Sequence, residues 1–296
     1  MLRGLYSAAS GMITQQRKHD TITNNIANLN TPGFKGNQAV SRSFPEMLMS
    51  IVREQSDKPG AHTLGRLHFG VMPEENVAVF QQGDLQETNN PFDFALVSDL
   101  QVPGVAFDAG GKSITADGQR IYQPQAFFTV TGADGQARYT RNGKFTLNAD
   151  GQLITGEGFR VLGQDGQPIQ LVDPNGPNRP FAVKVNPNGQ LLNADTGQVL
   201  ATLLVTRVEN PQYLIREGYG IFRVGDGLDA GTRPVNLADP TDKIAIKQGY
   251  YERSNVDPTQ SMVDMMTAAR AFEANQKVIQ AYDRSMDKAV NDVGRV

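Results

Sequence analysis

The last part of the chain carries the pattern that most constrains its fold. Apolar side chains recur there in steps of three, four or seven residues, the spacing that places them on one face of an α-helix. They are Met262, Met265, Ala269, Phe272, Ile279, Met286, Val290 and Val293. Asp257 followed by Pro258 predicts an N-cap with proline at the first helical position, and Gln260 stands where it could complete a capping box. We predict a helix over residues 258–293, longer than is usual in a globular protein.

The first part of the chain has the same helical period. Small and apolar side chains lie at Leu2, Leu5, Tyr6, Ala9, Met12, Ile13 and Ile26. Pro32 cannot continue a helix, and it disfavours the helical conformation at Thr31. We therefore predict that this helix ends near Asn28.

Two such helices need something to pack against. Most amphipathic helices cover the core of their own domain, but two helices buried only against each other would gain less from apolar burial than the ordering of their residues costs. They must therefore dock onto the rest of the chain or onto other chains. We predict a discontinuous, coiled-coil-like terminal domain whose candidate assembly interface is Leu2, Leu5, Ala9, Met12, Ile13, Ile26, Met262, Met265, Ala269, Phe272, Ile279, Met286 and Val290.

The middle of the chain changes to a period of two, which is typical of β-strands. Alternation runs over residues 127–130, 138–141 and 144–147, and Asp-Gly or Asn-Gly pairs such as Asp134-Gly135 and Asn142-Gly143 follow as hairpin signals. The chain has 30 Gly and 16 Pro, which favours short strands and many turns. We predict an α+β fold with a central β-rich domain of hairpins. An extended connector containing one short helix around residues 45–52 would lead into it.

Composition argues against several classes of partner. The formal net charge is −3 and the basic residues are scattered, so no basic stripe is present to bind nucleic acid. The longest apolar run, residues 199–205, is too short for a membrane span, and the first residues lack the apolar core of a secretory signal peptide. The absence of Cys excludes disulfides and thiolate sites. We expect no nucleic acid, no membrane insertion and no cleaved signal peptide.

The sequence offers little catalytic chemistry. Residues 106–113 nearly match a phosphate-binding loop, but they lead to another turn and not into a helix whose N-terminus could face a phosphate. His19, His62 and His68 form no helical ligand pair, and no Gly-x-Ser-x-Gly elbow occurs. We predict no catalytic residue, no cofactor and no metal. One alternative stays open, a hydrolase or carbohydrate-binding module with its active loop among residues 98–126.

Both ends of the chain resemble the same family. Residues 23–35, TNNIANLNTPGFK, are similar to the N-terminal signature of the bacterial flagellar rod and hook proteins. Residues 249–256, GYYERSNV, and residues 262–275 are similar to the family's other terminal signature, while 82–93 and 127–153 resemble its middle. The signature residues are Asn24, Asn25, Asn28, Thr31, Pro32, Gly33, Phe34, Lys35, Ser254, Asn255, Val256, Glu273 and Asn275.

The resemblance implies a structural axial subunit of the flagellum, of rod type and nearest to the distal rod. Its partners would be other copies of the chain, neighbouring rod and hook subunits, and the flagellar type III export apparatus that delivers it to the basal body. The expected divisions are an N-terminal helix (1–33), a connector (34–82), a β-rich domain (83–247) and a C-terminal helix (248–296). Residues 98–126 depart from the family's short link, so we expect an extra hairpin or surface loop there.

Overall fold

The computed structural model describes residues 2–293 apart from 52–61, 101, 103, 109–110, 116–117, 119, 172–182, 236 and 238–242. The chain divides into two compact units. The helical unit comprises Met1–Ile26, Asn37–Val77 and Asp257–Val296, and the central unit comprises Ala27–Gly36 and Ala78–Val256. Each unit is therefore built from stretches that lie far apart in the sequence.

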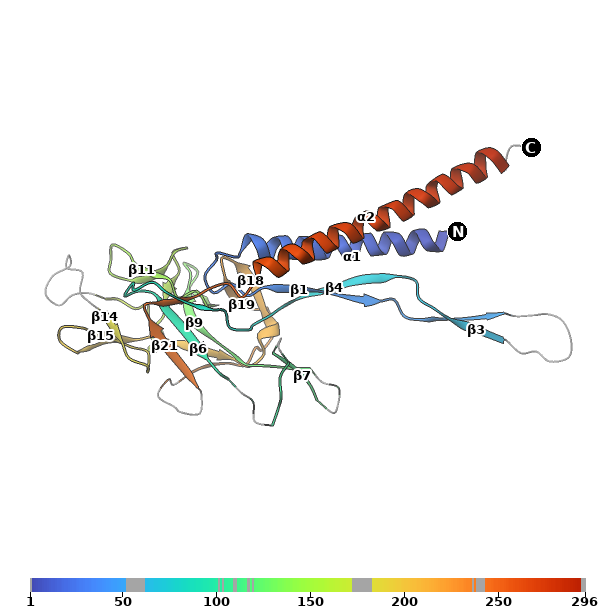
Figure 1. Ribbon diagram of the computed structural model, residues 1–296. Coiled ribbons are helices and arrows are strands. Elements are labelled where there is room, and N and C mark those ends of the chain that lie inside the picture. The colour runs from blue at the N-terminus through green and yellow to red at the C-terminus, as the bar shows by residue number, and fades with distance from the viewer. Residues whose placement is uncertain are drawn as a thin grey trace. The chain divides into compact units, whose positions relative to one another are not determined.

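Two helices dominate the helical unit. They are α1 (Leu2–Ala27) and α2 (Pro258–Lys288), and α2 continues into the π-helical turn η2 (Ala289–Val293). The two run in opposite directions (Figure 1). The predicted N-cap is confirmed, because the Asp257 side chain accepts hydrogen bonds from the backbone of Thr259 and Gln260. The predicted capping box is wrong, since the Gln260 side chain donates forward to Asp264 and does not reach back.

Two strand pairs complete the helical unit. They are β1 (Asn37–Ser43) with β4 (Val71–Ala78), and β2 (Met47–Ile51) with β3 (His62–Leu67). The short helix predicted around residues 45–52 is therefore wrong, because β2 pairs antiparallel with β3. A helix this short is barely stable in water, whereas pairing with β3 supplies the backbone hydrogen bonds that it would lack.

The largest sheet of the central unit contains nine described strands. They are β9 (Gln125–Thr131), β10 (Ala137–Thr140), β11 (Phe145–Leu147), β12 (Leu153–Thr155), β13 (Arg160–Val161), β17 (Val205–Val208), β18 (Leu214–Gly218), β19 (Ile221–Val224) and β20 (Thr232–Pro234). Their order is β11-β12-β13-β9-β10-β19-β18, and β17 pairs with both β9 and β20.

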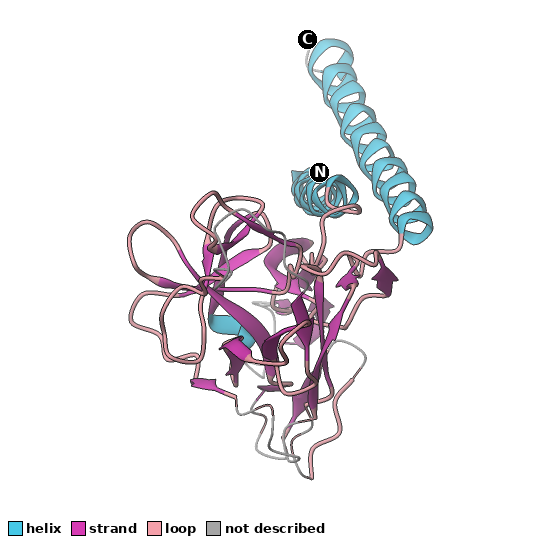
Figure 2. Cartoon of the chain, turned by 90° about the vertical axis from the view of Figure 1, so that its left-hand side faces the viewer, coloured by secondary structure: helices cyan, strands magenta, loops and turns pink. Residues whose placement is uncertain are grey.

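Smaller ladders surround this sheet, and strands and loops make up nearly all of the unit (Figure 2). The ladders are β5 (Leu85–Glu87) with β22 (Tyr250–Glu252), β6 (Phe94–Ser98) with β21 (Ile244–Gln248), β7 (Lys112–Ile114) with β8 (Arg120–Tyr122), and β14 (Val183–Val185), β15 (Gln190–Asn193) and β16 (Val199–Thr202) together. A short 3₁₀-helix, η1 (Pro211–Tyr213), precedes β18. The predicted α+β class is confirmed.

Strand β9 lies at the centre of the core and is buried along its whole length. Phe128 and Val130 belong to the larger apolar cluster, while Phe127 belongs to a second cluster that includes Tyr139 and Phe222. A strand buried on both faces reads as a continuous apolar run, and for this reason the sequence shows Phe127 and Phe128 side by side.

The turn signals have mixed outcomes. Asp134-Gly135 joins the antiparallel strands β9 and β10, so that hairpin is confirmed. Asn142-Gly143 joins β10 to β11, but β11 pairs with β12 and not with β10, so that hairpin signal was misleading. A Cβ on Gly143 would collide with the Phe94 carbonyl oxygen. Glycine stands there because two backbones approach closely, not because the chain reverses direction.

Residues 98–126 contain the hairpin β7–β8. The Asp108 side chain accepts a hydrogen bond from the backbone of Lys112, the first residue of β7, and residues 109–110 of the near match lie outside the described residues. The near match to a phosphate loop therefore enters a strand and not a helix, and it lacks the helix N-terminus that binds phosphate in such loops.

Candidate assembly site

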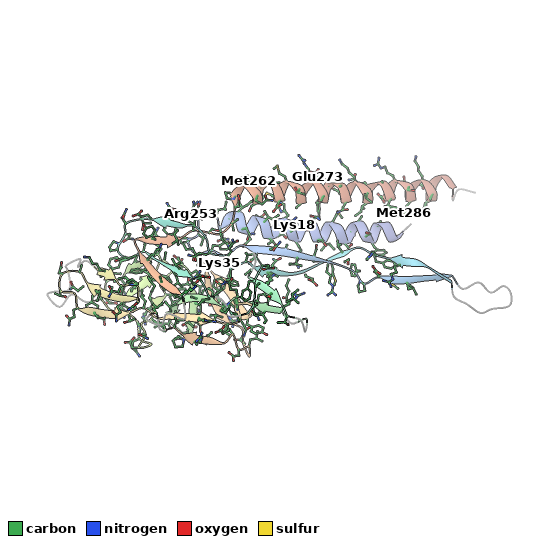
Figure 3. All side chains as sticks on the ribbon, turned by 60° about the horizontal axis from the view of Figure 1, so that its bottom comes forward. Lys18, Lys35, Arg253, Met262, Glu273 and Met286 are labelled. Atoms are coloured by element: carbon green, nitrogen blue, oxygen red, sulfur yellow. The ribbon has the colours of Figure 1, made fainter. Side chains whose placement is uncertain are left out.

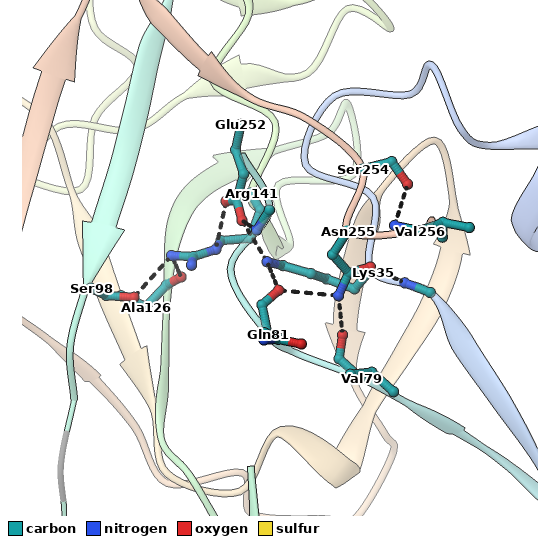
Figure 4. Close-up of polar contacts among 12 residues, drawn as sticks. Lys35, Val79, Gln81, Ser98, Ala126, Arg141, Glu252, Ser254, Asn255 and Val256 are labelled. Atoms are coloured by element: carbon teal, nitrogen blue, oxygen red, sulfur yellow. Dashed lines mark hydrogen bonds and ion pairs between the residues drawn. The ribbon is translucent and has the colours of Figure 1, made fainter. Parts of the chain in front are cut away.

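A buried ion cluster joins three distant segments of the central unit (Figure 4). Lys35 Nζ lies 2.6 Å from Glu252 Oε1, and Arg141 Nε lies 3.2 Å from Glu252 Oε2. The side chains of the two cations are each 1% exposed, and that of Glu252 is 0% exposed. The chain thus holds two cations around one carboxylate, away from water.

Backbone groups satisfy much of the remaining hydrogen-bonding capacity of this cluster. Lys35 Nζ donates to the carbonyl of Gln81, at 2.8 Å, and Arg141 Nη1 donates to the carbonyl of Ala126, at 2.9 Å. The backbone N–H of Gly83 donates to Glu252 Oε1. Buried charges are tolerated when paired and hydrogen-bonded in this way, and the cluster fixes how these segments meet.

The cluster shifts the pKa values of two of its members. Burial lowers the pKa of Lys35 from 10.5 to about 8, despite the opposing attraction of Glu252. Burial by itself would raise the pKa of Glu252, but the charges of Arg141 and Lys35 outweigh it and hold that pKa below its ordinary value.

This arrangement predicts a pH dependence of stability. Between about pH 8 and 10.5 the unfolded chain binds the Lys35 proton more tightly than the folded chain does, so unfolding takes up a proton and stability rises with pH across that window. In the Lys35→Met variant this contribution, on the order of 3 kcal/mol, should be missing. Urea unfolding followed by circular dichroism at several pH values would measure it, and parallel profiles for the two proteins would contradict it.

The two terminal signatures meet beside the cluster. The N–H of Gly33 donates to the carbonyl of Glu252, at 2.7 Å. Asn255 accepts from the N–H of Gly36 and donates to the carbonyl of Val79. The buried ring of Phe34 lies 4.6 Å from Arg216 Cζ, a cation–π contact. These signature residues therefore join the segment that follows α1 to the segment that precedes α2, within the central unit.

Other signature residues shape the turns that follow α1. The Asn25 side chain donates a hydrogen bond to the carbonyl of Asn37 and accepts one from the Asn37 N–H. Thr31 donates to the side chain of Asn28. Asn24 is exposed, Pro32 is half-buried, and Ser254 accepts from the N–H of Val256. Sequence analysis did not select Arg141 or Glu252 as site residues, although both stand within the motifs that carried the resemblance.

The interface of α1 with α2 follows a seven-residue repeat. On α2 the residues that are buried or half-buried in alternate steps of four and three are Ser261, Met265, Ala268, Phe272, Asn275, Ile279, Tyr282 and Met286. A Cβ on Gly4 would collide with the ring of Tyr282, and one on Gly11 would lie 2.9 Å from Asn275 Nδ2. The glycines of α1 thus make room for large side chains of α2, as in an antiparallel coiled coil.

The predicted interface residues differ in their exposure. Half-buried are Leu5, Ala9, Met12, Ile26, Met265, Ala269, Phe272, Ile279 and Met286, whereas Ile13, Met262 and Val290 are 56%, 56% and 71% exposed. The side chain of Leu2 lies outside the described residues. The predicted interface did not include Gly4, Ala8, Gly11 or Tyr282. The two glycines have no side chain that could mark a face, and their role depends on the α2 side chains opposite them.

A groove of about 370 Å³ opens beside the seam. Its lining comes from both helices and consists of Gln15, Gln16, His19, Asp20, Ala268, Ala269, Phe272 and Glu273. Across the described part of the chain, no group of three His, Asp or Glu side chains is placed to hold a metal ion. No helix within those same residues is long and apolar enough to cross a membrane.

Three family models match separate parts of the chain. "Flagella basal body rod protein" matches residues 5–35, "Flagellar hook protein FlgE/F/G D1 domain" matches 123–193, and "Flagellar basal body rod FlgEFG protein C-terminal" matches 247–292. The first and last contain the two terminal signatures, and the second covers the strands β9 to β13 of the large sheet.

Curated relatives match over almost the whole length. The flagellar hook-basal body complex protein FlhO of Bacillus subtilis is 38% identical over 299 residues, covering 100% of both chains. The flagellar basal-body rod protein FlgG of Agrobacterium fabrum is 29% identical, covering 95% of this chain and 96% of its own. The rod protein FlgF of Mesorhizobium japonicum is 28% identical over 99% of both. This is a structural family, so the hydrolase alternative was wrong. The chain belongs to the flagellar basal-body rod and hook protein family, as a structural axial subunit of the flagellum.

Proposed function

We propose that this subunit polymerises through its paired terminal helices, binding other copies of itself and neighbouring rod or hook subunits. The observation that carries the proposal is an apolar face of α1 that the described residues of the helical unit leave exposed. Tyr6 and Ile13, seven residues apart, are 67% and 56% exposed, and the half-buried Leu5, Ala9 and Met12 lie next to them. Apolar patches of this kind on a protein surface mark contacts with other proteins.

The other faces of α1 are already occupied. One carries Gly4, Ala8 and Gly11 towards α2. Another contacts β4, where Ser10 Oγ accepts from the N–H of Val71 and Thr21 donates to the Asn76 side chain. The face of Tyr6 and Ile13 is therefore the one left for another subunit. On α2, the first three turns add Met262, Val263 and Met266, which are 56%, 47% and 54% exposed.

The family relationship supports two finer parts of the proposal. The relatives are named rod proteins and hook-basal body complex proteins, which supports a position in the rod. Within the rod we propose a position nearest to the distal rod, as the family resemblance implies. We also propose delivery through the flagellar type III export channel, the route that the family resemblance implies.

A pair of substitutions on α1 tests the assembly interface. Tyr6→Glu together with Ile13→Glu should weaken self-association of the full chain at least tenfold, because each places a charge in a contact that excludes water. Sedimentation velocity over a range of protein concentrations measures the change. The control is Leu228→Glu, since Leu228 is 48% exposed in the central unit and should leave association unchanged. If the double variant associates as the unaltered chain does, this face is not the interface.

A further inference from the structure

The groove between α1 and α2 has an apolar floor and an acidic rim. Ala268, Ala269 and Phe272 form the floor, and the exposed carboxylates of Asp20 and Glu273 stand at the rim. Within the described residues, Glu273 forms no ion pair or hydrogen bond, and Asp20 Oδ1 lies 4.0 Å from His19 Nδ1. The groove can therefore take the aliphatic stem of a long basic side chain and present a carboxylate to its charged end.

A row of basic side chains runs along the outer face of α2. Arg270, Lys277 and Arg284 are exposed and recur every seven residues, so they share one face and stand about 10 Å apart. Arg270 follows the seam residue Met265 by five positions, which places the row on the side turned away from α1. Figure 3 labels Glu273 midway between Met262 and Met286 on this helix. No ion pair among the described residues involves Arg270, Lys277 or Arg284.

We infer that the basic row of one copy docks into the acidic groove of the next copy. This inference rests on the proposed polymerisation and specifies its contact. The row lies on the outer face of α2 and the groove lies between α2 and α1, with Glu273 at the edge where the two surfaces adjoin. Their union is a head-to-tail contact that leaves a free row and a free groove at the two ends. Such a contact propagates along a filament, whereas a contact between two identical patches closes at a dimer. The opposite charges set the register of the contact and exclude wrong pairings.

Two competing partners for Glu273 lie on its own helix, because Arg270 stands three residues before it and Lys277 four residues after it. Pairs at those spacings form readily on helix surfaces. Neither is formed in the structure, and either would act on helix stability without affecting association. Variants that alter association while leaving helicity intact therefore separate the two roles.

Two charge-reversed full chains test the inference. The groove variant carries Asp20→Lys and Glu273→Lys, and the row variant carries Arg270→Glu, Lys277→Glu and Arg284→Glu. In either variant alone, the row and the groove carry charge of the same sign. Each variant should therefore self-associate at least tenfold more weakly than the unaltered chain. Mixed in equal amounts they should associate again, because each variant offers the charge that the other now lacks. The control is Asp226→Lys, a reversal at a 92% exposed side chain of the central unit.

Sedimentation velocity measures association, and circular dichroism checks that helicity is kept. Should a reversed variant lose helicity, the neutral variants Glu273→Gln and Lys277→Gln replace it, each expected to weaken association to a smaller degree. Only a recovery of association in the equal mixture supports the inference. Unchanged association of either folded variant, or no recovery on mixing, overturns it. An unaltered chain that stays monomeric at every concentration overturns self-polymerisation itself, which is a different failure.

Discussion

Glu252→Gln should lower the free energy of unfolding by about 3 kcal/mol, because it leaves Lys35 and Arg141 buried without a counter-charge. The side chains of these two cations are each 1% exposed, so water cannot replace the lost carboxylate. Glutamine keeps the shape of glutamate and can still accept a hydrogen bond from the N–H of Gly83, so the loss reports charge and not packing. Urea unfolding at neutral pH, followed by circular dichroism, measures it.

The matched control is Glu217→Gln. Glu217 also sits between two arginines, Arg138 and Arg223, but its side chain is 31% exposed. Surface ion pairs of this kind contribute less than about 1 kcal/mol. If both substitutions lower the free energy of unfolding by the same small amount, the cluster around Glu252 does not stabilise the central unit.

The sequence predicts the helices well because their signals are local. Asp257 and Pro258 define the start of α2, and Pro32 sets the end of α1, each through backbone geometry within a few residues. The seam between the helices is less accessible to prediction. Its fit depends on Gly4 facing Tyr282 and Gly11 facing Asn275, and a glycine in a helical pattern shows no preference for any face.

The β-rich unit shows the same contrast between local and distant contacts. Asp134-Gly135 fixes a hairpin between neighbouring strands, but Asn142-Gly143 carries an equally strong turn signal and serves a contact with Phe94 instead. Nothing within a few residues of Gly143 distinguishes the two cases, because the segment that approaches it comes from β6.

The ion cluster lay beyond prediction from spacing alone. Lys35 and Glu252 are separated by 217 positions, and a buried pair at such a distance leaves no periodic trace. The family resemblance marked Lys35 and Asn255 as important without saying why. The structure supplies the reason, since the signatures at both ends of the chain converge on Glu252 and on the backbone around it.

Gly33→Ala should be among the most damaging single substitutions in the chain, costing about 3 to 5 kcal/mol of stability. Gly33 has a φ of +66°, a conformation that disfavours side chains, and its N–H donates to the carbonyl of Glu252. An added Cβ would lie 2.6 Å from both the carbonyl carbon of Arg141 and the amide nitrogen of Asn142. These are backbone atoms, so relief requires moving the segment that carries Arg141 away from Glu252.

Gly135→Ala separates this effect from ordinary backbone strain. Gly135 has a φ of +73°, close to that of Gly33, but an added Cβ would meet nothing within 4 Å. It should cost only about 1 kcal/mol, the cost of the unfavourable φ alone. The difference between the two variants in urea unfolding therefore measures the clash with the Arg141 segment. A difference near zero would mean that the N-terminal signature can shift without disturbing the cluster, and its glycine would then serve the turn after α1 rather than the attachment of the chain ends.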